Sequence, residues 1–264
     1  MSPEAAGLEV SGLSIDIGGR RVVDDLSFSV ATGERLGLIG ESGSGKSLSI
    51  LSLVGLAPAD AVVAGSVRLD GRELVGLSER ELARVRGRQI GMVFQDPLAA
   101  LNPLHTIGRQ IGEPLRLHEG LSRRDALERA VDAAAEVGLP DPAQITRLYP
   151  HQLSGGQRQR VGIAIALACR PALILADEPT TALDVTTQAA ILDLFQRLVD
   201  ERGASLVFVT HDLAVLARIT SDVVVLSHGR AVERGTVDGI LRGAEHPVTQ
   251  GLVAAARATT WRAS

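Results

Sequence analysis

A glycine-rich segment near the N-terminus has the composition needed to hold a polyphosphate. It fits the pattern G-x-x-x-x-G-K-[ST] without a mismatch. Its glycines let the backbone wrap closely around an anion, and a helix that begins at Lys46 adds the positive end of its dipole. Lys46 brings a compact charge to the β- and γ-phosphates, and the Ser47 hydroxyl suits Mg²⁺. The predicted nucleotide-binding set runs on to position 48 and contains Gly40, Glu41, Ser42, Gly43, Ser44, Gly45, Lys46 and Ser47.

The composition of the chain singles out Lys46. Of the 27 basic residues, Lys46 is the only lysine and all others are arginines. The general preference for arginine reflects codon composition, such as that of a GC-rich bacterial genome. Because the chain departs from this preference once, position 46 requires an ammonium group rather than a guanidinium group.

Two acidic residues follow a continuous apolar run, Leu173–Ala176. Ligands of open α/β sheets bind at the carboxyl ends of the strands, so this run should deliver both acids to the phosphate site. We expect Asp177 to act on the Mg²⁺ side, through water, and Glu178 to polarise the attacking water as a general base. The alternative is an acidic helix N-cap, against which Pro179 argues.

A second candidate anion site lies about 110 residues after the first, at Leu153–Gln157. Ser154 is a good helix N-cap, and the two glycines that follow it leave the N–H groups of the first turn uncovered. One γ-phosphate cannot be wrapped by both loops of a compact monomer without a long rearrangement of the chain. The sequence therefore predicts a head-to-tail pair, in which the second loop of each chain caps the nucleotide of its partner.

The pattern of apolar residues predicts an α/β fold. In the first third, apolar residues alternate, and hairpin turns are expected at Gly18-Gly19 and Asp70-Gly71. The second half alternates helix and strand, which is typical of βαβ units. Helices are expected over 122–137, 154–170, 186–201 and 213–219, and strands over 35–39, 90–94, 173–176, 206–209 and 223–226.

The length, composition and net charge of the chain exclude several classes of protein. With 264 residues, 45% hydrophobic content and a net charge of −4, the chain should be globular, and it lacks the cationic excess of a nucleic-acid-binding protein. The single cysteine, Cys169, excludes a disulfide framework and a cysteine-ligated metal centre. We expect Cys169 to be a core residue in an apolar helix.

Membrane spans are not expected. The longest uncharged, mostly apolar stretch in the middle of the chain, Val161–Cys169, is far shorter than the roughly 20 residues that cross a bilayer. Met1–Gly7 lacks the basic-then-apolar pattern of a secretory signal. We therefore expect a soluble, cytoplasmic chain that can still dock on a membrane protein.

Six segments, in this order, resemble the motifs of ABC-type ATPases. They are Gly40–Ser47 (Walker A), Gln95 (Q-loop), Leu153–Gln157 (signature motif), Leu173–Glu178 (Walker B), Ala182–Asp184 (D-loop) and His211 (H-loop). The resemblance implies a RecA-like P-loop core with an N-terminal antiparallel β-subdomain and an inserted helical subdomain. It places the ATPase domain at 6–243, with the β-subdomain and core at 6–95 and 159–243. The helical subdomain then covers about 96–158, and a short tail covers 244–264.

The resemblance also implies roles for individual residues. Gln95 would sense the γ-phosphate and Mg²⁺ and couple them to a transmembrane partner. His211 would hold the attacking water and Glu178 in place, so the implied catalytic set is Glu178, His211, Gln95 and Lys46. Asp184 would contact the phosphate loop of the opposite chain, and a helix-capping role is compatible with this.

One position departs from the family pattern. The family usually stacks an aromatic residue on adenine, and Ile17 stands at the corresponding position. Base–aromatic stacking contributes roughly 1–3 kcal/mol, part of which an isoleucine recovers through apolar contact. We therefore expect weaker discrimination between nucleotide bases rather than loss of binding.

Further features narrow the family resemblance to importer subunits. Between Gln95 and Leu153 there is room only for a small helical lobe, and the chain has one cassette and no fused membrane helices. Phe94–Leu104 and Glu245–Leu252 are similar to segments of the dipeptide, oligopeptide and nickel importers, with Val248 in place of a tyrosine. An accessory ATPase of a soluble phosphonate-breakdown complex is the alternative. A metabolic P-loop kinase is disfavoured because it needs no Leu153–Gln157 loop.

The implied assembly is a membrane-bound transporter. Its expected ligands are ATP and Mg²⁺, and its expected partners are two transmembrane permease subunits and a second ATPase subunit, identical or a sibling. An extracytoplasmic substrate-binding protein would act indirectly, and no nucleic acid is expected. The chain would sit peripherally on the cytoplasmic face of the inner membrane.

Overall fold

The computed structural model describes residues 7–181 and 183–260. Two compact units divide the chain: unit 1 comprises Met1–Leu82 and Gly203–Ser264, and unit 2 comprises Ala83–Arg202. Unit 2 therefore interrupts the sequence of unit 1. The domain boundaries expected from the sequence, at 95/96 and 158/159, stay a prediction.

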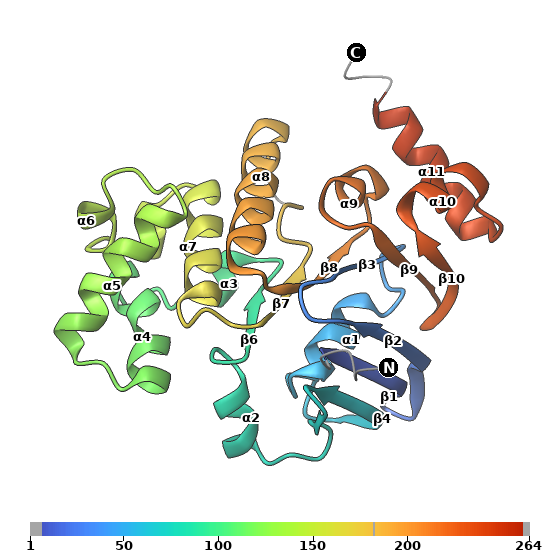
Figure 1. The fold of residues 1–264 in the computed structure, drawn as a ribbon, viewed down its shortest axis with the longest axis horizontal. Coiled ribbons are helices and arrows are strands. Elements are labelled where there is room, and N and C mark those ends of the chain that lie inside the picture. Colours follow the sequence, from blue (N-terminus) through green and yellow to red (C-terminus); the bar gives the residue numbers. More distant parts are fainter. Residues whose placement is uncertain (1–6, 182, 261–264) are drawn as a thin grey trace. The chain divides into compact units, whose positions relative to one another are not determined.

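An antiparallel sheet with the strand order β2-β1-β4-β5 opens unit 1 (Figure 1). Alternate side chains of β1, such as Leu8 and Val10, are buried because successive side chains of a strand point to opposite faces. The hairpin turns at Gly18-Gly19 and Asp70-Gly71 have positive φ at both central residues, as the tight hairpin turns require. The strands are β1 (Leu8–Ile17), β2 (Arg20–Val30), β4 (Ala61–Leu69) and β5 (Arg72–Glu73).

A second group of strands in unit 1 carries the glycine-rich loop. β3 lies parallel between β8 and β9, and β10 pairs with β9 in antiparallel fashion. β3 and β8 are continuous apolar runs because both of their faces are covered. α11 packs on α9 and β3. The elements are β3 (Arg35–Gly40), α1 (Lys46–Leu53), β8 (Ser205–Thr210), α9 (Leu213–Ile219), β9 (Asp222–Ser227), β10 (Arg230–Thr236), α10 (Val237–Gly243) and α11 (Pro247–Thr260), and α2 (Glu79–Val85) crosses the boundary between the units.

Unit 2 combines a parallel strand pair, β6 and β7, with helices. α4 and α5 pack closely because glycines face the partner helix: a Cβ atom added at Gly112 would lie 2.9 Å from the carbonyl oxygen of Ala126. Arg202 ties α8 to α5 and α7, since it pairs with Glu136 at 2.6 Å and donates to the Leu167 carbonyl. The elements are β6 (Ile90–Val93), α3 (Pro97–Ala100), α4 (Ile107–Glu119), α5 (Arg123–Glu136), α6 (Pro142–Ile145), η1 (Pro150–Gln152), α7 (Gly155–Leu167), β7 (Leu173–Asp177) and α8 (Val185–Arg202).

Cys169 lies two residues beyond the end of α7, not inside a helix as the sequence suggested. Its side chain is half-buried against a small apolar cluster that includes Leu115 and Ala126. Burial raises the pKa of the thiol to about 11, because the thiolate loses hydration there. Cys169 is therefore a packing residue with an unreactive thiol.

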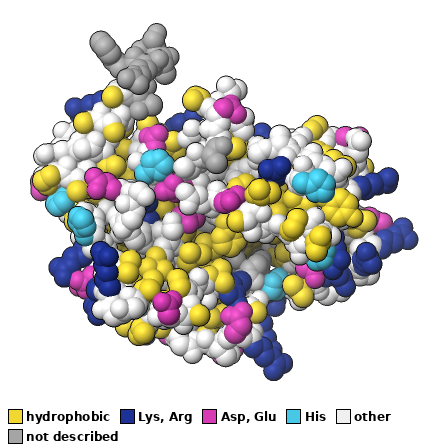
Figure 2. Space-filling model, turned by 180° about the vertical axis from the view of Figure 1, so that it is seen from behind, with side chains coloured by type: hydrophobic (Ala, Val, Ile, Leu, Met, Phe, Trp, Pro, Cys, Tyr) yellow, Lys and Arg dark blue, Asp and Glu magenta, His cyan; other side chains and the backbone are white. Residues whose placement is uncertain are grey.

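The surface mixes charges of both signs. On the face drawn in Figure 2, acidic and basic side chains are interspersed among hydrophobic and neutral ones. Within residues 7–181 and 183–260, no helix combines the length and the apolar composition that crossing a bilayer requires.

Two glycines with similar backbone angles test how far unit 1 depends on a close backbone approach. Gly19 has φ of 78° with no atom near its missing Cβ, whereas Gly229 has φ of 80° and a Cβ there would lie 2.2 Å from the carbonyl oxygen of Val22. We expect Gly19→Ala to cost about 1 kcal/mol of unfolding free energy, from the positive φ alone. Gly229→Ala should cost at least about 2 kcal/mol more, because backbone must also move. Urea unfolding of both variants measures this, and equal costs would contradict the close approach.

Candidate functional site

The glycine-rich loop of unit 1 joins the end of β3 to the start of α1. Gly45 is the N-cap of α1 and has φ of 100°, which a side chain would strain. No side chain makes a capping hydrogen bond at the N-terminus of α1. An anion bound at this position would interact favourably with the first-turn N–H groups and the helix dipole.

The ammonium group of Lys46 is buried inside this loop. The residue is only 4% exposed, and Nζ donates to the carbonyl oxygens of Gly40 and Glu41, each at 2.8 Å. A buried cation requires such partners.

Close contacts and an orphan hydroxyl complete the loop. A Cβ at Gly40 would lie 2.2 Å from the carbonyl oxygen of Leu226, so this position must be glycine. Ser44 Oγ is buried and has no hydrogen-bond partner among the described residues. Such an unsatisfied donor fits a site that takes a polyphosphate oxygen. The loop is braced by Gly229, whose N–H donates to the Ser44 carbonyl at 3.1 Å, a contact that the sequence did not predict.

Position 48 does not belong in the predicted nucleotide-binding set. The residue there is Leu48, in α1, and its side chain has no group that hydrogen-bonds to a phosphate. Its inclusion is wrong for that chemical reason. The eight residues before it contain all the polar and glycine positions of the loop.

Unit 2 brings two of the predicted catalytic residues together. Glu178 follows β7 directly, is 9% exposed, and has φ of 41°. A left-handed backbone at a non-glycine residue costs about 1–3 kcal/mol and is typical of functional sites. Its Oε2 accepts from Gln95 Nε2 at 3.4 Å and from Thr181 Oγ1 at 2.8 Å. Asp177, the last residue of β7, is 5% exposed.

The segments named as signature motif and D-loop are neighbours within unit 2. Ser154 caps α7 in a capping box with Gln157, and both Ser154 and Gly155 are exposed. A Cβ at Gly156 would lie 2.8 Å from the methyl group of Thr187, which packs this loop on the start of α8. Asp184 caps α8 by accepting from the Thr187 N–H at 3.0 Å, and this hydrogen bond lowers the pKa of its carboxyl. Position 182 lies outside the described residues.

The other predicted residues are in unit 1. His211 is exposed and follows β8, and the next residue, Asp212, caps α9. Ile17 is the half-buried last residue of β1. Lys46 and His211 belong to unit 1, whereas Gln95 and Glu178 belong to unit 2, and their joint action on one nucleotide stays a prediction.

An uncapped helix after a glycine-rich loop, on parallel strands with a buried lysine, defines a P-loop nucleotide-binding protein. The family model described as "ABC transporter" matches residues 23–181. The chain belongs to the ABC transporter family, as one of its ATP-binding subunits. This confirms the family, the α/β fold with a P-loop core, and ATPase activity as the enzymatic class.

Two groups of relatives from Brucella are similar over most of the chain. A protein of Brucella melitensis, provisionally named a peptide import ATP-binding protein, is 51% identical over 88% of this chain and 70% of its own length. A protein of Brucella abortus with the same kind of name is 48% identical over 94% of this chain and 76% of its own length.

Solved structures show the same fold. The ATP-binding cassette MJ0796, in a dimeric post-hydrolysis state with ADP and Pi, matches with a TM-score of 0.77 and 31% identity over 87% of this chain and 98% of that one. CbiO1 of Clostridium perfringens, part of the transporter complex CbiONQ, matches with a TM-score of 0.76 over 90% of this chain and 92% of its own. At 24% identity, this second match supports the fold alone.

Thr181, which the sequence did not single out, contacts the predicted general base Glu178. Its hydroxyl donates to the Glu178 carboxylate, and a hydrogen bond to a charged group contributes about 1.5–3 kcal/mol. We expect Thr181→Val to lower kcat for ATP hydrolysis about tenfold with little change in KM, because the carboxylate loses its orientation. Thr181→Ser, which keeps the hydroxyl, should restore the rate. Steady-state kinetics with unaltered turnover in Thr181→Val would show that this hydrogen bond does not matter.

Proposed function

We propose that this chain is the ATP-hydrolysing motor subunit of an importer that energises the uptake of peptides. The observation that carries this proposal is the 51% identity, over 88% of the chain, to a protein named for peptide import. Nickel or other metal chelates are the second cargo class, since the segments Phe94–Leu104 and Glu245–Leu252 resemble importers of both kinds. The soluble phosphonate-breakdown complex is not favoured, because the Brucella relatives carry importer names.

In this proposal, the loop of unit 1 holds the triphosphate of ATP. Its first-turn N–H groups and Lys46 Nζ bind the β- and γ-phosphates. The Ser47 hydroxyl and the Asp177 carboxylate are hard oxygen donors of the kind that suit Mg²⁺, and the cation neutralises charge on the phosphates when bound. In this proposal the cation is held mainly by substrate phosphates and water.

Glu178 serves as the general base. Its carboxylate is largely buried and is oriented by Thr181 and Gln95, so it is held ready to polarise a water molecule. His211 holds the water and the base in place during in-line attack on the γ-phosphate. Gln95 couples the presence of the γ-phosphate to the segment that follows it.

Two ATPase subunits work as a head-to-tail pair. The exposed Ser154 and Gly155 are available to a partner, and the adjacent Val185 leaves 82% of its surface uncovered. An exposed apolar side chain beside a second anion site suits an interface with another chain. We propose that Ser154 and Gly156 of one chain close on the nucleotide held by Lys46 of the other, and that the partner is a copy or a sibling.

The permeases dock on the segment Phe94–Leu104. Its side chains Phe94, Leu98 and Leu104 are 38%, 51% and 81% exposed, which is unusual for large apolar residues so close together in sequence. Two transmembrane permease subunits would cover them at the cytoplasmic face of the membrane. An extracytoplasmic binding protein would deliver cargo to the permeases, and nucleic acid has no part in the cycle.

Glu178→Gln tests the motor role. In proteoliposomes with candidate peptide permeases and their binding protein, the wild type should take up labelled oligopeptide in an ATP-dependent manner. Glu178→Gln should bind ATP and form a stable dimer, while turnover and uptake fall at least about a hundredfold, because a general base contributes 10²–10⁴-fold. Glu128→Gln is the matched control, since Glu128 is an exposed partner of Arg124 on α5.

The outcomes separate the parts of the proposal. Wild-type turnover in Glu178→Gln rules out Glu178 as the base. A second outcome is that Glu178→Gln loses ATP hydrolysis, while the wild type hydrolyses ATP but transports neither peptide nor a nickel chelate. This outcome would contradict the importer function and leave the ATPase assignment intact.

A further inference from the structure

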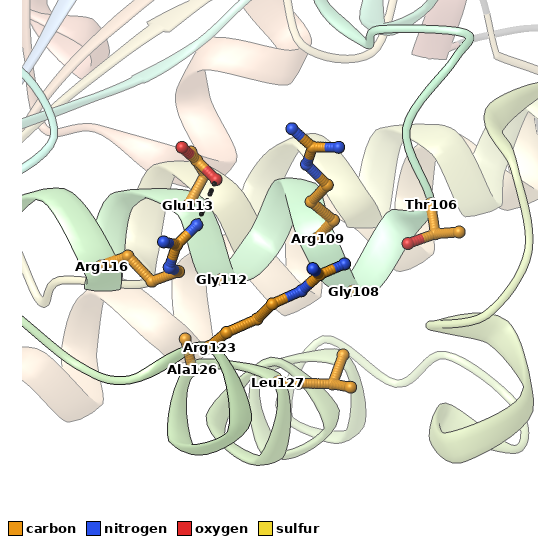
Figure 3. A pocket seen from close by; sticks show the side chains of 9 residues that line it. All are labelled: Thr106, Gly108, Arg109, Gly112, Glu113, Arg116, Arg123, Ala126 and Leu127. Atoms are coloured by element: carbon orange, nitrogen blue, oxygen red, sulfur yellow. Dashed lines mark ion pairs between the residues drawn. The ribbon is translucent and has the colours of Figure 1, made fainter.

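A cationic cavity of about 240 Å³ lies within unit 2, between α4 and α5 (Figure 3). Three arginines line it: Arg109 and Arg116 from α4, and Arg123 from α5. In Figure 3, the Arg123 side chain extends along the gap between the helices toward Gly108. Gly112 and Ala126 form part of its wall, and the backbones of the two helices come close there, since a Cβ atom at Gly112 would lie 2.9 Å from the Ala126 carbonyl oxygen.

Two of the three guanidinium groups have no partner in the part of the chain that the structure describes. Arg116 shares its charge with Glu113, with 3.6 Å between Nη1 and Oε2. Arg109 and Arg123 make no side-chain hydrogen bond or ion pair with any residue among 7–181 and 183–260. The cavity therefore carries three positive charges against one negative charge, which leaves an uncompensated excess of two.

The positions of these arginines run against helix electrostatics. Arg109 lies in the first turn of α4 and Arg123 is the first residue of α5. Cations at a helix N-terminus are repelled by the positive end of the dipole, so both arginines lower the stability of their helices. The neighbouring Arg124 pairs with Glu128 at 3.0 Å, whereas the Arg123 side chain extends into the cavity. The two unpaired guanidinium groups therefore supply the excess positive charge of the cavity.

A neutral hydrogen-bonding group lies in the same cavity. Thr106 is the N-cap of α4, yet its side chain makes no capping hydrogen bond. Its hydroxyl lines the cavity and is available to a ligand there. An anion at this position would meet a hydroxyl donor and the planar forks of two arginines.

We propose that this cavity binds a phosphate group, either as inorganic phosphate or as a phosphate monoester. Guanidinium forks match the oxygen pairs of phosphate, and a dianion balances the excess of two charges. The volume is below the roughly 300–1,000 Å³ of sites for larger organic ligands, so the phosphate enters while any ester substituent stays in solvent. The ligand bridges α4 and α5, which should raise the melting temperature of the protein.

Calorimetric titration with inorganic phosphate tests the proposal. The titration uses Lys46→Ala protein, so that the nucleotide loop does not contribute, at constant ionic strength. We expect binding that is at least tenfold weaker when Arg109→Gln and Arg123→Gln are added together. Arg124→Gln is the matched control, because it removes one positive charge from the same helix turn, and it should leave the affinity unchanged. Circular dichroism checks that each variant is folded.

Several results would overturn the phosphate site. They are equal affinity in the Arg109→Gln/Arg123→Gln variant, an equal loss in Arg124→Gln, and tight binding of succinate, which would show a carboxylate site instead. Cosedimentation with vesicles of phosphatidate in phosphatidylcholine identifies the source of the phosphate. Binding to these vesicles that is lost in the double variant assigns a lipid headgroup, and binding of inorganic phosphate alone assigns a soluble ligand. Binding of neither excludes the site.

Discussion

The nucleotide loop depends on one buried charge. Lys46 Nζ draws the carbonyl groups of Gly40 and Glu41 inward at 2.8 Å, which closes the loop on itself. The same loop leaves the N-terminus of α1 without a side-chain cap. Burial removes water from the ammonium group, so its attraction to a phosphate is stronger there than it would be in water. The other predicted catalytic residues would act on the phosphate that Lys46 binds.

Glu178, the predicted general base in unit 2, is held in place by its backbone conformation and by hydrogen bonds to its carboxylate. Glu178 has a left-handed backbone and a carboxylate that is bound by side chains from two other positions. The strain and the hydrogen bonds serve the same purpose, since each restricts the carboxylate to one orientation. A base that is oriented before substrate arrives loses little entropy during the reaction. Gln95 follows β6 and donates a hydrogen bond to the Glu178 carboxylate. Movement of the segment after β6 would therefore change the position of this carboxylate.

Sequence patterns predicted the elements with strong local signals. The two hairpin turns, the apolar strand before Asp177 and the helix behind Ser154 were all expected, because turn chemistry, continuous apolar runs and N-caps act over a few residues. α4 was not predicted: its buried Ile107, Ile111 and Leu115 have helical spacing, but two glycines and Pro114 interrupt the pattern. The hydrogen bond from the Gly229 N–H to the Ser44 carbonyl joins residues far apart in the chain, so no local sequence signal could predict it.

Replacing Lys46 by arginine tests the central claim most directly, since it keeps the charge and changes only its shape. All other basic residues of the chain are arginines, so the substitution is ordinary for this sequence. A planar guanidinium does not fit where Nζ lies 2.8 Å from two carbonyl oxygens. Equilibrium titration with a fluorescent ATP analogue should show at least tenfold weaker binding by Lys46→Arg, about 1.4 kcal/mol, in a protein that is still folded. Affinity equal to that of the wild type would contradict the account.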